Sequence, residues 1–111
     1  MHSALESIRP QLEWACDALI PRDDYLGMPA ATRAGVAETL LPRALAARQE
    51  LLYPFVEAMR TLPSEPPSDP LEVLYGMDEA SFELVAHTIA DAYYLSDEVN
   101  RTLKYPGPAL C

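Results

Sequence analysis

Residues 77–108, MDEASFELVAHTIADAYYLSDEVNRTLKYPGP, carry the clearest helix signals in the chain. Asp78 suits an N-cap, because a short carboxylate accepts first-turn backbone N–H groups and complements the positive end of the helix dipole. We therefore expect a helix from about Glu79. Its apolar residues recur at helical spacing and predict one buried stripe: Phe82, Val85, Ala86, Ile89, Ala90 and Tyr93.

A corner follows this helix at residues 93–97. Ser96 is placed to cap a second helix, which would turn Val99 and Leu103 inward. The sequence Tyr105-Pro106-Gly107-Pro108 cannot continue a helix, because proline lacks an N–H group and glycine favours turns. We expect residues 105–111 to form a stiff terminal turn and tail, with Tyr105 pinned onto the body.

Composition points to one all-α domain over residues 1–111. The chain has 32 Ala and Leu residues against 8 Val and Ile, which favours helices over strands. A chain of 111 residues is long enough for one modest core. The prediction is a compact bundle of about five to six short helices punctuated by prolines.

Earlier helices show the same period with interruptions. A first helix would run to Ile20, and Pro10 either kinks it or occupies its first turn; we prefer the second, with residues 1–9 as a loose lead-in. Pro42 and Pro54 predict kinks or fresh starts in the middle of the chain. Residues 63–70 form a proline-rich loop, after which Asp69 caps a brief helix.

Charge is unevenly distributed. The formal net charge is −9, and residues 61–100 contain nine acidic residues and no Lys or Arg. This field disfavours nucleic acid and anionic membrane surfaces, whereas it allows a basic protein partner. A solvated surface that aids solubility is the simpler interpretation.

The two cysteines predict neither a disulfide framework nor a metal site: Cys16 lies on an apolar stripe and Cys111 is the last residue. No uncharged run reaches ten residues, so we expect no direct membrane insertion, and the first residues do not resemble a signal peptide. The expected compartment is the cytoplasm, or the periplasm if a leader was removed or a partner carries the export signal.

Catalytic and cofactor-binding motifs are not evident. Glu83, His87 and Asp91 share one helix face, but positions eight apart lie about 12 Å apart along the axis, which makes a shared metal ion difficult. A weaker hypothesis is a metal-dependent activity through Glu83 and His87. Adjacent Asp23 and Asp24 lack further ligands at alternating positions and suit turn capping. We expect no catalytic residues, no metal and no cofactor.

Aromatic residues near helix ends and breaks are either structural or interface residues. They are Tyr25, Tyr53, Tyr75 and Tyr94, and Trp14 lies off the stripe of its own helix. Trp14 and Tyr94 are the candidates for contact with a partner.

Four short segments together resemble the gluconate 2-dehydrogenase subunit 3 family, the small subunits of flavin-dependent dehydrogenase complexes. The likeness runs from about Gln11 to Pro108, and its most telling parts are the Tyr93-Tyr94 pair and the terminal turn. The segments are Leu19-Ile20-Pro21-Arg22-Asp23-Asp24, Ala34-Gly35-Val36, Ala92-Tyr93-Tyr94-Leu95-Ser96 and Leu103-Lys104-Tyr105-Pro106-Gly107-Pro108.

The resemblance implies a non-catalytic helical subunit that binds a large flavoprotein of the glucose-methanol-choline type, which oxidises sugars or sugar acids. A cytochrome subunit would pass the electrons onward, and the small subunit would stabilise or mature its partner. The expected partner-binding residues are Trp14, Tyr93, Tyr94, Tyr105, Pro106, Gly107 and Pro108. The alternative is a free-standing acidic adaptor or regulator whose segment 65–98 binds a basic protein.

Overall fold

The computed structural model describes the backbone of residues 2–104 and the side chains of residues 3–102. Within this part, the regular elements are helices, and one isolated antiparallel bridge joins Asp23 and Met28. The all-α prediction is confirmed. The elements are α1 (His2–Ser7), α2 (Arg9–Leu19), α3 (Ala31–Ala34), the π-turn η1 (Val36–Leu40), α4 (Leu41–Ala47), the 3₁₀ turn η2 (Gln49–Leu51), α5 (Leu52–Arg60), α6 (Pro70–Tyr75), α7 (Glu79–Tyr93) and α8 (Asp97–Lys104).

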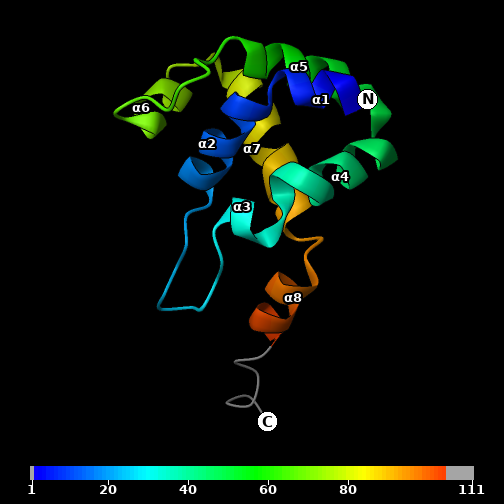
Figure 1. Ribbon diagram of the computed structural model, residues 1–111, viewed down its shortest axis with the longest axis vertical. Coiled ribbons are helices and arrows are strands. Elements are labelled where there is room, and N and C mark those ends of the chain that lie inside the picture. Colours follow the sequence, from blue (N-terminus) through cyan, green and yellow to red (C-terminus); the bar gives the residue numbers. More distant parts are fainter. Residues whose placement is uncertain (1, 105–111) are drawn as a thin grey trace.

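Helix α7 is the centre of the bundle. It packs against α4, α5 and η1, while α2 packs against α3 and α6, and α8 extends from the far end of α7 (Figure 1). Val85, Ile89 and Ala92 on α7 are fully buried. Asp78 caps the helix by accepting a hydrogen bond from the Ser81 backbone N–H at 3.1 Å, as predicted.

The buried face of α7 is rotated slightly from the predicted stripe. Thr88 and Ala92 are buried, whereas Ala86 and Ala90 are only partly so. Because two sides of α7 meet α4 and α5, neighbouring helices decide which of its small residues become buried. Alanine is more hydrophobic than threonine, so a prediction from hydrophobicity alone expects alanine to be the more buried of the two. The predicted stripe was therefore wrong at this edge of the helix.

The prolines are accommodated in two different ways. Pro10 lies in the first turn of α2, where a missing N–H group costs no intrahelical hydrogen bond. Pro42 lies in helical backbone that continues from the π-turn η1 into α4, since Leu40 and Leu41 both have right-handed helical dihedral angles. Residues 1–9 were predicted as a loose lead-in, which is wrong for residues 2–7 because they form α1. Leu5 and Ile8 are buried in the core and hold this first helix against the body.

Polar side chains of α2 tie this helix to the proline-rich loop and to α3. The Trp14 indole N–H donates to the Pro63 carbonyl oxygen at 2.9 Å, at the start of the proline-rich loop. The Asp17 carboxylate accepts hydrogen bonds from the backbone N–H and the hydroxyl of Thr32, at 2.9 and 2.7 Å, and so ties α2 to α3. In the loop before α3, Asp23 accepts from the backbone N–H groups of the two residues that follow Asp24, so it caps a turn as expected.

Candidate functional site

The corner between α7 and α8 holds the two adjacent tyrosines of the predicted partner site, and their side chains differ in exposure. Tyr93 is 2% exposed, and its hydroxyl donates to the Pro29 carbonyl oxygen at 2.7 Å. Desolvation by burial, with smaller contributions from nearby negative charge, raises the pKa of Tyr93 above its usual value. Tyr94 is 53% exposed and contacts the Tyr93 ring edge-on, with ring centres 5.7 Å apart.

Hydrogen bonds from the backbone and from two side chains fix this corner on both sides. The Ser96 hydroxyl accepts from the Val99 N–H at 3.2 Å and caps α8, as predicted. The Asn100 side-chain amide donates to the Tyr94 carbonyl oxygen at 2.9 Å, and the Tyr94 N–H closes the last turn of α7. Tyr94 and Leu95 are therefore presented at the surface by a rigid turn.

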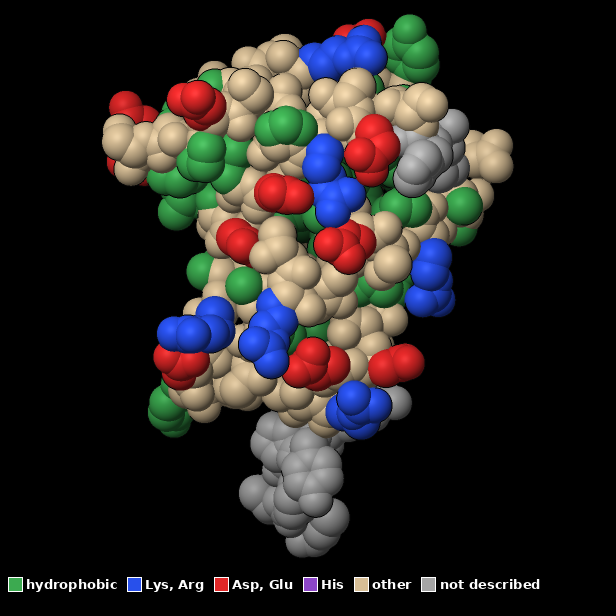
Figure 2. Space-filling view, in the orientation of Figure 1, with side chains coloured by type: hydrophobic (Ala, Val, Ile, Leu, Met, Phe, Trp, Pro, Cys, Tyr) green, Lys and Arg blue, Asp and Glu red, His purple; other side chains and the backbone are tan. Residues whose placement is uncertain are grey.

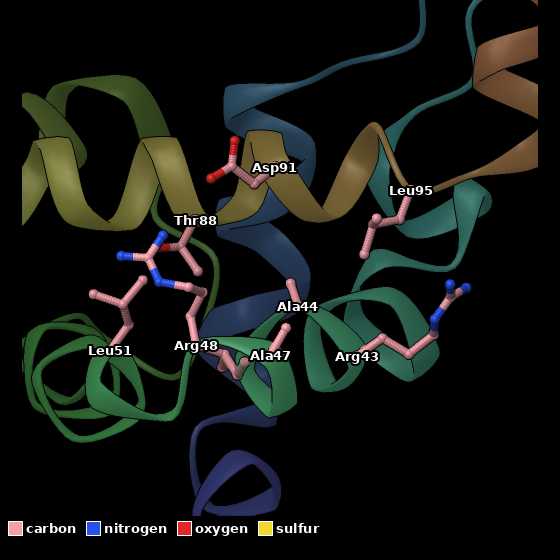
Figure 3. A pocket seen from close by; sticks show the side chains of 9 residues that line it. Arg43, Ala44, Ala47, Arg48, Leu51, Thr88, Asp91 and Leu95 are labelled. Atoms are coloured by element: carbon pink, nitrogen blue, oxygen red, sulfur yellow. The ribbon is translucent and has the colours of Figure 1, made fainter.

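A cleft of about 290 Å³ opens beside this corner, between α4 and the second half of α7. Its floor is apolar, and Figure 3 shows alanines of α4 facing the side of α7 that carries Thr88, with Leu95 at one end. The lining residues are Arg43, Ala44, Leu45, Ala47, Arg48, Leu51, Thr88, Asp91 and Leu95. Together with Tyr94 we call them the corner surface.

Charged side chains frame the cleft. The Arg48 side chain rises from the end of α4 toward α7 (Figure 3), and its Nε lies 2.7 Å from a carboxylate oxygen of Glu50. The hydrogen bond and charge of Glu50 raise the pKa of Arg48, with a smaller effect from Asp91, and Arg48 in turn lowers the pKa of Glu50. Both side chains thus stay charged at neutral pH, and the cleft joins an apolar floor to a polar rim.

This lining offers little catalytic chemistry. Its described residues include a hydroxyl at Thr88 and a carboxylate at Asp91, and they include no cysteine or histidine. The geometry suits an inserted side chain that combines apolar and polar atoms, because such a group matches both floor and rim.

The other predicted partner residues lie elsewhere. Trp14 was a candidate because it falls off the stripe of its helix; it is 8% exposed and hydrogen-bonded to the proline-rich loop, so its role in this structure is packing. The buried position of Tyr93 also leaves little of its surface for a partner. Tyr105, Pro106, Gly107 and Pro108 lie outside the described residues.

The helix face with Glu83, His87 and Asp91 is exposed, and the structure assembles no metal site there. Among the described side chains, those of residues 3–102, no group of three or more His, Cys, Asp or Glu residues is placed to hold a metal ion. Asp91 instead borders the cleft. Cys16 is fully buried, as expected, and burial raises the pKa of its thiol to about 12.

Sequence reasoning missed the cleft itself. No local sequence pattern indicated that α4 would face α7 across a gap. The sequence signal that could have pointed there is the pairing of small Ala44 and Ala47 with Thr88, which leaves unfilled space between two helices.

No protein-family model, curated protein or solved structure matches this chain. The helices in the described part of the chain are too short or too polar for any of them to cross a membrane. The family resemblance therefore rests on the quoted sequence segments.

Proposed function

We propose that this chain is a non-catalytic accessory subunit that binds and stabilises a flavin-dependent dehydrogenase through the corner surface. The observation that supports it most is the half-exposed Tyr94 beside a cleft with an apolar floor, on a turn held from both sides. Exposed tyrosines on rigid supports are frequent energetic centres of protein interfaces, since they bury a large area with little loss of entropy.

In this proposal the partner provides the chemistry. A flavoprotein of the glucose-methanol-choline type oxidises a sugar or sugar acid, a cytochrome subunit accepts the electrons, and the present chain binds no cofactor. The partner class comes from the sequence resemblance, and the docking surface comes from Tyr94, Leu95 and the adjoining cleft. Partner side chains would fill the cleft and cover Tyr94, so that apolar burial carries most of the affinity.

A pull-down from native extract with the tagged chain tests the proposal. The retained material is analysed by absorbance and mass spectrometry. We expect a stoichiometric protein with the two-banded visible spectrum of oxidised flavin and dehydrogenase activity on a sugar or sugar acid. Repeated recovery of a defined partner that lacks flavin would contradict it.

The charge distribution favours a second candidate, an acidic adaptor for a basic protein. Nine acidic residues and no Lys or Arg lie in residues 61–100, and such a field accelerates association with a basic surface. Salt separates the candidates: binding by charge weakens steeply as ionic strength rises, whereas apolar docking at the corner surface changes little.

A further inference from the structure

The end of the molecule formed by α6 carries an exposed strip of apolar side chains. Leu71 and Tyr75 lie one turn apart on the outer side of α6 and are 39% and 66% exposed. The Tyr75 ring contacts Phe82 of α7, with ring centres 5.4 Å apart, so the strip continues from one helix to the next. An exposed tyrosine held against a second ring has a fixed orientation and is suited to binding.

A hollow of about 460 Å³ lies beside this strip, between the end of α5, α6 and the start of α7. Leu62, Val73 and Met77 provide apolar lining, and Glu72 and Asp78 provide carboxylates. Hydrogen bonds from Ser81 hold the pKa of Asp78 below its usual value, so this carboxylate is charged at neutral pH. We call Leu71, Glu72, Tyr75, Asp78, Phe82 and the lining of the hollow the α6 surface.

The charged residues that belong to this surface, Glu72 and Asp78, are both acidic. Figure 2 shows acidic and hydrophobic side chains gathered over α6, at the upper left. Residues 61–100, which supply all of the α6 surface, include no Lys or Arg to neutralise these carboxylates. An acidic rim around apolar side chains complements a partner that presents basic and apolar groups together.

We infer that the α6 surface binds a basic amphipathic helix of a protein partner. An apolar side chain of that helix would enter the hollow, and a Lys or Arg about one turn away would pair with Glu72 or Asp78, because residues three or four apart share a helix face. A second cation would lie over the Tyr75 ring, whose face attracts positive charge. This inference deepens the second candidate function, on which it rests, and is independent of the flavoprotein assignment.

The probe is a fluorescein-labelled model peptide of leucine and lysine, about five helical turns long and amphipathic. Its binding to the full chain is measured by fluorescence anisotropy at two salt concentrations. We compare it with the same peptide carrying glutamate in place of lysine, and with oligolysine, which has the charge without the apolar face.

Matched variants locate the binding. Tyr75→Ser should weaken peptide binding by about tenfold, and Tyr75→Phe should restore it, because the ring provides both burial and cation attraction. Tyr53→Ser is the control, since Tyr53 is a comparably exposed tyrosine on α5. Glu72→Gln should weaken binding by about threefold, whereas Glu98→Gln, in the same acidic segment but on α8, should have a smaller effect. Circular dichroism checks that each variant is folded.

Three other results would overturn the inference, each in a distinct way. No binding of the leucine-lysine peptide removes both the α6 surface and the second candidate function. If Tyr75→Ser leaves peptide binding unchanged and oligolysine binds equally well, the peptide is held by diffuse charge attraction. The second candidate function would then stand without a defined binding site. If the chain self-associates and Tyr75→Ser abolishes this self-association, the α6 surface binds a second copy of the chain instead of a partner helix. Whether the Tyr75→Ser protein still binds a flavoprotein is measured separately, and that result bears only on the first proposal.

Discussion

At the residue scale, two buried aromatic side chains, Trp14 and Tyr93, contribute to packing within the bundle. Trp14 and Tyr93 each bury a ring and send one polar atom to a loop carbonyl, on Pro63 and Pro29. Each of these hydrogen bonds joins residues far apart in sequence, and a typical one contributes about 1 kcal/mol. An aromatic residue that lies outside the apolar stripe of its helix therefore does not indicate an interface when its polar atom is hydrogen-bonded to a loop. The sequence does not indicate which loop packs against Trp14, so its role in packing could not be predicted.

Cys16 makes stability sensitive to alkaline pH. The folded chain keeps the thiol protonated to about pH 12, whereas the unfolded chain releases the proton near its ordinary pKa of 9.0. Above pH 9 the unfolded state therefore binds fewer protons, and the free energy of unfolding falls as pH rises, by up to about 1.4 kcal/mol per pH unit. This contribution is fully present below pH 9 and is lost as the pH approaches the folded pKa.

The measurement is urea denaturation at several pH values between 8 and 11, on proteins that carry Cys111→Ser so that one thiol remains. Cys16→Ala should show a distinctly shallower decline above pH 9 than the protein with Cys16. Parallel declines would mean that the thiol ionises as readily in the folded chain as in the unfolded one.

At the element scale, the N-terminal ends of three helices were the most predictable part of the structure. Asp69, Asp78 and Ser96 each cap the helix that the sequence assigned to them. Capping depends on a side chain and a backbone N–H group two or three residues away, so local sequence is enough. The π-turn η1 and the rotated face of α7 were not predictable, because both depend on how separate helices pack.

Ser96→Ala tests whether the corner depends on its cap. The substitution leaves the Val99 N–H without its acceptor next to a fully buried side chain, and we expect a loss of about 1 kcal/mol in the free energy of unfolding. Amide hydrogen exchange should accelerate first in α8. Ser64→Ala, in the exposed proline-rich loop, is the control and should change neither. Unchanged exchange in α8 would show that packing of Val99 alone holds this helix.

At the scale of the whole molecule, α7 separates two surfaces of different character. It begins beside the α6 surface and ends at the corner surface (Figure 1), and its fifteen residues span about 22 Å. One surface combines exposed apolar groups with negative charge, and the other combines an exposed tyrosine with a cleft of mixed charge.

The sequence predicted that Tyr94 is exposed for a partner and that residues 61–100 are acidic. The first feature belongs to the corner surface and the second to the α6 surface. It could not place the cleft or the hollow, since each is enclosed by helices distant in sequence. The all-α class could be predicted from composition and from the helical spacing of apolar residues. The cleft and the hollow depend on how the helices pack against one another.

The central claim is that the corner surface docks the flavoprotein, and affinity for that partner with Tyr94→Ala tests it most directly. Tyr53→Ala is the matched control, since both tyrosines are more than half exposed. We expect unchanged circular dichroism for both variants, at least about tenfold weaker binding for Tyr94→Ala, and wild-type binding for Tyr53→Ala. Undiminished binding of a folded Tyr94→Ala protein would contradict the claim.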